Sequence, residues 1–340
     1  MPLRLLPWAP EYGTSMQFDA DEAAEATGAV DATVERAQWA PVDPAGEPPH
    51  ALQVVDGVRR AEAHAMDDDA NGEPLCGLFG SFAVGVVRCE DGHASIPEPQ
   101  LRVERRYLQA GGDPRHREVP AGDATLLFRA EVPEGARSAN ALVDALNRAM
   151  LDEEAKLAEE LSRDAATLTF VDGPLRTLRA PGQHVVGYVK RIHNWYLDAE
   201  QLRILPRLAV GQRTPLFRIT SHDGRERYSW YLRLADLGDR YHTLGGVMRL
   251  EAPGAQPPHA AVVLADQSTL ALPRLASSPV RDPRAPQNLT PVGALERVLT
   301  HRLGDRRWLR RLLAAAVGEG ADAVAAASAL VHANAKGGAA

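Results

Sequence analysis

The chain has 340 residues, of which 45% are hydrophobic and 24% are charged, and its net charge is −7; these values are ordinary for a globular protein. It contains no run of about 18 apolar residues and no apolar core of signal-peptide length near its start, so we predict neither a membrane span nor secretion. The only cysteines, Cys76 and Cys89, form no CxxC motif. This favours reduced thiols in a cytoplasmic protein over a disulfide or a zinc site.

The charge is distributed unevenly along the chain. Residues 1–172 hold 15 Lys and Arg against 32 Asp and Glu, a balance of −17. Residues 173–250 hold 13 against 6, a balance of +7, and residues 251–340 hold 10 against 7, a balance of +3. The basic middle segment indicates either a surface for a polyanion such as nucleic acid or an ordinary solvated face.

The predicted elements start with an extended arm at 1–16 and an Ala- and Glu-rich helix from Asp19 to Trp39, followed by a proline-rich linker. Strands are predicted from apolar runs at 51–56, 75–89, 124–132, 166–172, 184–190, 227–236 and 260–266, with a polar excursion at 107–123. Helices are predicted at 138–161, 198–208, 293–303 and 306–317, followed by an Ala-rich helix and a frayed tail. This order predicts an α/β fold with a mixed sheet and helices packed on it.

Two of these strands end in the same way, VVDGVRR at 54–60 and FVDGPLR at 170–176. Each apolar run is followed by Asp-Gly, which places Asp56 and Asp172 where the chain leaves the sheet. A single Asp-Gly pair is more typical of a surface turn. Two copies around an acidic helix favour a site for a divalent cation, because carboxylate oxygens are the ligands of magnesium and manganese.

The helix at 138–161 offers five acidic candidates for this site. Residues three, four and seven positions apart share a helix face, so Glu154 lies among Met150, Leu157 and Leu161. A carboxylate on an apolar face is costly unless it is paired or bound to metal, which makes Glu154 the first choice. Glu153, nearer the polar boundary, is the reserve.

Basic residues follow the same strand ends. Lys190 comes directly after the apolar run HVVGYV at 184–189 and is one of only three lysines, so it is expected either to contact a scissile phosphate or to lie on the surface. The arginines expected to contact DNA are Arg59, Arg60, Arg176, Arg179 and Arg191. Together with Lys190 they are expected to place positive charge beside the predicted metal site.

The ordered segments VVDGVRR, MLDEEAKLAEEL, FVDGPLR and GYVKR resemble the motifs of the NurA nucleases. The segments RYSWYLRL and DPRAPQNLTPVGALERVLTHRLGD are similar to the bacterial branch of that family. The resemblance covers residues 50–312. It implies an N-terminal arm and helix at 1–49, a nuclease domain with an RNase H-like core at 50–312, and a C-terminal helix and tail at 313–340.

The resemblance also implies an activity and partners. The implied activity is that of a manganese-dependent (or magnesium-dependent) deoxyribonuclease, an exonuclease on DNA ends and an endonuclease on single strands. The implied assembly is a homodimer around DNA. It would work with HerA, a hexameric ATPase, in the resection of DNA ends. A cytoplasmic, nucleoid-associated location would follow. By position, Asp56, Glu154 and Asp172 become metal ligands and Lys190 a phosphate-side residue.

The fourth ligand departs from the family pattern. Where many members carry Ala-His on the last helix, this chain has Glu296, with His301 five residues further along. Either could fill the position.

Two other classes of function remain open. A non-catalytic DNA clamp beneath a translocase would make the acids structural, and a carboxylate-pair glycosidase would need no metal. The arm at 1–16 and the helix with Arg306, Arg307, Arg310 and Arg311 are both candidates for a partner surface. A DNA contact or an unliganded helix is equally compatible with the latter.

Overall fold

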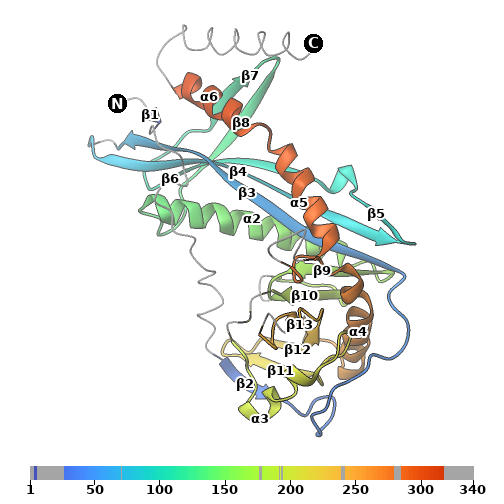
Figure 1. Ribbon diagram of the computed structural model, residues 1–340. Helices are drawn as coiled ribbons and strands as arrows, with labels where there is room; N and C mark the ends of the chain where they lie inside the picture. The colour runs from blue at the N-terminus through green and yellow to red at the C-terminus, as the bar shows by residue number, and fades with distance from the viewer. Residues whose placement is uncertain are drawn as a thin grey trace.

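Two long antiparallel strands, β3 (Ala51–Asp68) and β4 (Pro74–Glu90), lie at the centre of the sheet (Figure 1). A computed structural model describes residues 4–5, 27–69, 71–175, 178–190, 192, 194–238, 242–278 and 285–317. The strands of this part join in the order β2-β11-β12-β13-β10-β9-β3-β4-β6-β8-β7, with β1 on β3 and β5 on β4. No helix among the described residues is long and apolar enough to cross a membrane.

The other strands are β1 (Arg4–Leu5), β2 (Thr27–Asp31), β5 (His93–Ser95), β6 (Arg102–Gln109), β7 (Arg117–Ala121), β8 (Ala124–Glu131), β9 (Thr167–Asp172), β10 (Val185–Val189), β11 (Phe217–Ser221), β12 (Glu226–Arg233) and β13 (Val247–Pro253). The helices are α2 (Ala139–Leu161), α3 (Ala199–Leu202), α4 (Pro258–Ala271), α5 (Thr290–Arg302) and α6 (Arg306–Val317). Short 3₁₀ turns lie at Glu98–Gln100, Leu205–Arg207 and Leu272–Leu275.

The centre of the sheet has the order β6-β4-β3-β9-β10. Strands β3, β4 and β6 are antiparallel, whereas β9 and β10 run parallel to β3. Helix α2 lies between β8 and β9 in the chain, and α5 comes after the last strand. Three antiparallel strands, a helix and two parallel strands confirm the predicted RNase H-like mixed sheet.

The two faces of β3 and β4 are covered by different helices. Val55 packs in one core cluster with residues of α2, whereas Val54 packs in another with residues of α4 and α5. A register shift between Ala61 and Ala63 reverses the alternation of β3. Because of this shift, Ala63 and Ala65 contact α6 residues. Helices α5 and α6 therefore lie on one face of the long strands and α2 on the other (Figure 1).

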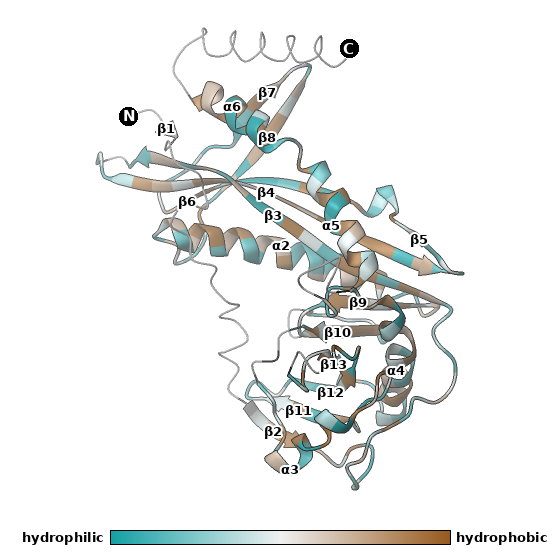
Figure 2. Cartoon of the chain, viewed as in Figure 1, coloured by the Kyte–Doolittle hydropathy of each residue, from teal (hydrophilic) through white to brown (hydrophobic). Residues whose placement is uncertain are grey.

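Helix α2 begins where the sequence predicts. The side chain of Ser138 accepts a hydrogen bond from the backbone N–H of Ala141, which satisfies one of the free donors of the first turn. Its buried residues include Leu142, Leu146, Met150 and Leu157, at the spacing of one helix face. Figure 2 shows hydrophobic and hydrophilic residues alternating along this helix.

Several predicted elements are wrong. The helix expected to reach Trp39 is a strand at Thr27–Asp31, because pairing with β11 overrides helix propensity; its first part lies outside the described residues. The segment 260–266 belongs to α4 and not to a strand, since a short apolar run fits either element. The helix predicted at 198–208 shrinks to α3 and a 3₁₀ turn.

The polar stretch after 101 contains two strands, β6 and β7, that we did not predict. Strand β6 is rich in arginine and pairs with β4, so its polar sequence hides a half-buried strand. The boundaries at 49/50 and 312/313 stay predictions, and α6 runs across the second of them.

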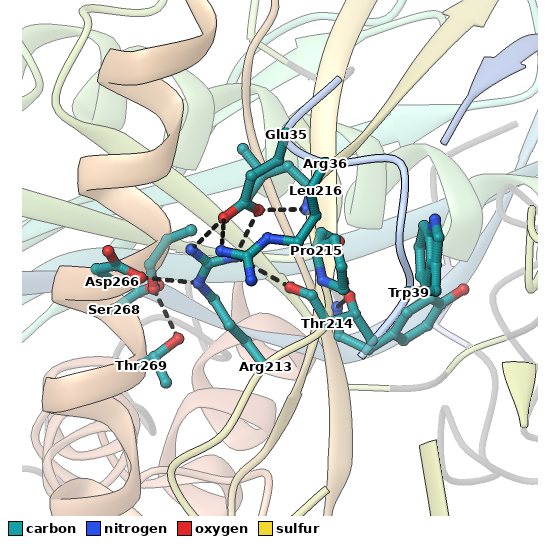
Figure 3. Close-up of polar contacts among 12 residues, drawn as sticks. Glu35, Arg36, Trp39, Arg213, Thr214, Pro215, Leu216, Asp266, Ser268 and Thr269 are labelled. Carbon is teal, nitrogen blue, oxygen red and sulfur yellow. Dashed lines mark hydrogen bonds and ion pairs between the residues drawn. The ribbon is translucent and has the colours of Figure 1, made fainter. Parts of the chain in front are cut away.

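A buried ion-pair network fixes the segment after β2 to the body of the fold (Figure 3). The guanidinium of Arg213, only 1% exposed, donates to both carboxylate oxygens of Glu35 at 2.8 and 2.9 Å. It also donates to Asp266 of α4 at 2.8 Å. Glu35 in turn accepts from the backbone N–H of Leu216 at 2.7 Å. Three segments far apart in the sequence thus meet at one buried arginine.

Candidate active site

Asp56 and Asp172 lie side by side at the point where β9 ends. Val55 of β3 is paired with Val171 of the parallel strand β9, so the next residue of each strand is an aspartate. Both aspartates alternate with residues of the α2 side and therefore lie on the α5 face of the sheet. Asp56 is buried, while the side chain of Asp172 is 31% exposed.

Glu154 reaches the same point from the opposite face. It is a buried residue of α2, and its carboxylate lies against the α-carbon of Gly57, so closely that a side chain at 57 would overlap with it. Interactions with Asp56 and Asp172 both raise the pKa of Glu154, although burial raises it most. The glycine of the first Asp-Gly pair therefore makes room for the helix acid.

Replacing Gly57 by alanine is expected to displace Glu154. The added methyl group would occupy the space of the carboxylate and would also press on Met150, 3.1 Å away. We expect the free energy of unfolding to fall by about 1–3 kcal/mol, as at other overpacked sites, together with a strong loss of activity. Urea unfolding and a cleavage assay check this, with Gly293→Ala, where the added methyl group would lie no closer than 3.8 Å to a neighbouring side chain, as the control. Unchanged activity in Gly57→Ala would show that Glu154 is not needed.

Lys190 closes the cluster on the β10 side. Its ammonium lies 2.7 Å from Asp172 Oδ2 and 3.2 Å from the side-chain oxygen of Asn288. Burial disfavours the charge, but Asp172, Asp56 and Glu296 outweigh it and raise the pKa of Lys190. Asn288 is 1% exposed and precedes α5, so it ties Lys190 to that helix. Asn288 could not be recognised from the sequence, since a polar residue in a loop gives no signal of burial.

Tyr188 was also missed as part of this site. It is paired with Asp172 across β9 and β10 and is fully buried. Burial raises its pKa well above the ordinary value, and the neighbouring carboxylates raise it further. The centre of the Tyr188 ring lies 5.3 Å from the Lys190 ammonium, so the lysine packs over the face of the ring.

The geometry separates the alternatives that the sequence leaves open. Glu153 binds Arg102 at 2.8 Å and Lys156 at 3.0 Å, so its carboxylate is engaged away from the aspartates. On α5, the half-buried Glu296 interacts electrostatically with Asp56 and Lys190. His301 is exposed one turn further along the helix. The structure thus brings Asp56, Glu154, Asp172, Lys190 and Glu296 together.

This cluster holds more negative charge than its surroundings neutralise. Burial, together with the charges of Asp172 and Glu296, raises the pKa of Asp56 to about 8, although Lys190 and the Gly57 N–H oppose the shift. The pKa of Glu154 is raised well above its ordinary value for the same reasons. Buried like charges favour the protonated forms unless a cation compensates them.

The donor set fits a hard divalent cation. All candidate ligands are carboxylate oxygens, and Asp56 Oδ2 is buried without a hydrogen-bond partner, which is costly for a polar atom. In the part of the chain that the structure describes, no three acidic, histidine or cysteine side chains form a ready-made metal group. Asp172 binds the Lys190 ammonium instead.

The metal-free chain should lose stability as the pH rises from about 4 to about 8. In this range folded Asp56, with its pKa raised to about 8, holds a proton that the unfolded chain releases, so folding binds protons and weakens at higher pH. A difference of one in pKa corresponds to about 1.4 kcal/mol. Urea unfolding at pH 5 and pH 8 in a chelator checks this, with Asp56→Asn as the comparison. Equal pH dependence in both proteins would contradict the raised pKa.

The predicted DNA-binding arginines do not form one group. Arg59 donates to Asn147 at 2.7 Å near the site. Arg60 binds Glu62 and the carbonyl oxygens of Leu303 and Gly304, so it caps the end of α5, and the geometry gives no support to a DNA contact.

Arg179 is exposed but lies elsewhere. Its backbone N–H donates to Glu159, near the C-terminal end of α2. The contacts of Arg59, Arg60 and Arg179 therefore do not join these arginines to the aspartates. Arg176 and Arg191 lie outside the described residues.

The part of the chain that holds most of this site is similar to known proteins. The family model described as the NurA domain matches residues 55–292, a span that contains Asp56, Glu154, Asp172 and Lys190 and ends before Glu296. The chain is also similar to the NurA nuclease from Sulfolobus solfataricus, with 11% identity, 78% of this chain and 85% of that chain covered, and a TM-score of 0.42. No curated protein matches the chain significantly. Since the family model covers more than half of its length, the chain belongs to the NurA family of nucleases.

Proposed function

We propose that this nuclease is a metal-dependent deoxyribonuclease whose active site is the cluster around Asp56. The observation that carries the proposal is the convergence on one point, beside a lysine, of the buried Asp56 and Glu154 and the partly exposed Asp172, which come from β3, α2 and β9. Acids from separate elements of the chain are needed to hold a cation from several sides. Manganese is the proposed metal, with magnesium as the alternative.

Asp56, Glu154 and Asp172 are the proposed metal ligands, with Glu296 in the fourth position. When bound, a divalent cation would polarise the scissile phosphate and make water a stronger nucleophile at neutral pH. A carboxylate can replace the histidine of other family members because both donate to manganese, although oxygen favours harder ions. Glu296 therefore bears on metal preference.

Lys190 is proposed to stabilise charge on the reacting phosphate. Its hydrogen bonds to Asp172 and Asn288 hold the ammonium at the border of the cluster, where the lysine side chain is 21% exposed. A fixed cation directed at developing negative charge lowers the barrier without reorganisation during the reaction. Asn288 positions the lysine and does not take part in the chemistry.

Family membership supports the wider biological proposal. We infer that the protein acts on DNA ends as an exonuclease, and on single strands as an endonuclease, in recombinational repair. A homodimer and a HerA-type translocase are the proposed partners. The arm at 1–16, a candidate for the translocase contact, lies almost entirely outside the described residues.

A cleavage assay tests the proposed reaction. End-labelled linear duplex, single-stranded DNA and closed circular DNA are incubated with manganese, magnesium, or a chelator. We expect cleavage of linear DNA with manganese, none with the chelator, and a strong loss in Lys190→Met that Lys190→Arg partly restores. DNA binding without cleavage under every metal condition would instead indicate the non-catalytic clamp.

A further inference from the structure

Helices α5 and α6 lead away from the candidate active site along one face of the long strands (Figure 1). Helix α5 carries Glu296 and packs on β3 and β4, and α6 packs on β3, β1 and β7. Their buried leucines, Leu295 and Leu299 in one and Leu309 and Leu312 in the other, point into cores on the same side of the sheet. The outer sides of α5 and α6 therefore lie on the same face of the sheet, and α5 lies beside the site.

This outer surface is basic. Residues 290–317 contain six arginines and two acidic residues. Arg297, Arg307 and Arg311 are exposed and pair with no carboxylate among the residues that the structure describes. Arg307 and Arg311 are four residues apart and share one helix face. Figure 2 shows hydrophilic residues on both helices beside the hydrophobic ones. We call Arg297, Arg307 and Arg311 the arginine track.

The track offers charge without apolar anchors. The large hydrophobic residues that are exposed in the described chain are Leu127, Val132, Val210 and Val263, none of which belongs to α5 or α6. The centre of a protein–protein interface is usually depleted in charge and rich in large apolar side chains. Unpaired arginines on a hydrophilic helix face instead suit phosphate groups, which they bind in a planar, forked geometry.

The spacing within the track suits successive phosphates of a DNA strand. Arg307 and Arg311 both belong to α6 and lie about 6 Å apart along its axis, at 1.5 Å per residue. Successive base pairs of duplex DNA are about 3.4 Å apart, so the two arginines span about two of them. We infer that the arginine track binds the DNA backbone beyond the scissile phosphate, on the side to which α6 leads. This inference rests on the proposed function, since it takes the acid cluster as the site of cleavage.

Salt-dependent binding tests the inference. The double variant Arg307→Gln/Arg311→Gln is compared with the wild type by fluorescence anisotropy in a chelator, which prevents metal-dependent cleavage. The probes are DNA hairpins with stems of about 4 and about 16 base pairs, of which only the longer exceeds the length of α5. A matched control is Arg203→Gln/Arg207→Gln, which removes two exposed arginines with the same spacing near α3, far from the track (Figure 1).

For the long stem, we expect the slope of log affinity against log salt to fall by about 2, since each phosphate contact contributes about 0.9. Affinity should drop roughly tenfold near 0.1 M salt. On the short stem, the double variant should bind with the affinity of the wild type. The control variant should bind both stems with the affinity of the wild type. Wild-type affinity of the double variant for the long stem, or an equal loss in the control, would overturn the inference.

Other outcomes are equally decisive. If the double variant loses dimerisation or translocase binding while its DNA affinity is unchanged, the track is a protein contact and the inference fails. If wild-type protein cleaves DNA and the variant binds it normally, the proposed function stands and the track fails. If the variant shows the reduced slope but the wild type cleaves no DNA, the track stands and the proposed reaction fails.

Discussion

Replacing Asp56 by asparagine is expected to lower metal-dependent DNA cleavage by at least about 100-fold. Loss of an outer hydrogen-bond partner of a metal ligand already costs about 10–100-fold in affinity or activity, so the loss of a central ligand should cost more. Asparagine keeps the size of the side chain and removes the buried charge. The variant should therefore fold, and without metal it should be more stable than the wild type at pH 8.

The effect on cleavage is measured as an initial rate on linear DNA at saturating manganese. Glu153→Gln is the matched control, since Glu153 neighbours Glu154 in the sequence but binds Arg102 and Lys156. The control should keep near wild-type activity. Full activity in both Asp56→Asn and Asp172→Asn would rule out the acid cluster as the active site.

Replacing Glu35 by alanine is expected to destabilise the fold by about 3–5 kcal/mol. Removing one partner of a buried ion pair leaves charge uncompensated, and among the described residues Arg213 would keep only Asp266 as a charged partner. The backbone N–H of Leu216 would also lose its acceptor. Since burial opposes ionisation but Arg213 prevails, the pKa of Glu35 is lowered, as expected for a carboxylate that stabilises the folded state.

Urea or thermal unfolding measures this loss. Glu47→Ala is the control, because Glu47 is an exposed acid a short distance further along the same segment. The control should change stability by less than about 0.5 kcal/mol. A loss in Glu35→Ala no larger than that of the control would show that the network in Figure 3 does not hold this segment in place.

The part of the site that depends on local patterns could be predicted from the sequence. Asp172 ends an apolar strand as predicted, and Glu154 lies on the apolar face of a strongly periodic helix. The prediction that the strand ends at Asp56 was wrong, because β3 continues to Asp68 and Asp56 lies within it, paired with β4. What the sequence could not give is the register of β3 against β9, which is set by residues more than 100 positions apart. That register makes the two aspartates neighbours.

Contacts between distant polar residues were beyond sequence reasoning for the same reason. Asn288 meets Lys190, and Glu35 meets Arg213, across 98 and 178 residues. Polar residues of this kind carry no periodic signal, so burial is evident only in the folded chain. Strand β6 was missed because its arginines read as loop, whereas its pairing with β4 decides its conformation.

The central claim is that acids from three separate elements hold a divalent cation. The most direct test is a crystal structure of the protein soaked with manganese, with an anomalous difference map recorded. We predict a peak within about 2.5 Å of carboxylate oxygens of Asp56, Asp172 and Glu154, with Glu296 facing it. A peak bound elsewhere, or none at this cluster in protein that cleaves DNA with manganese, would contradict the assignment.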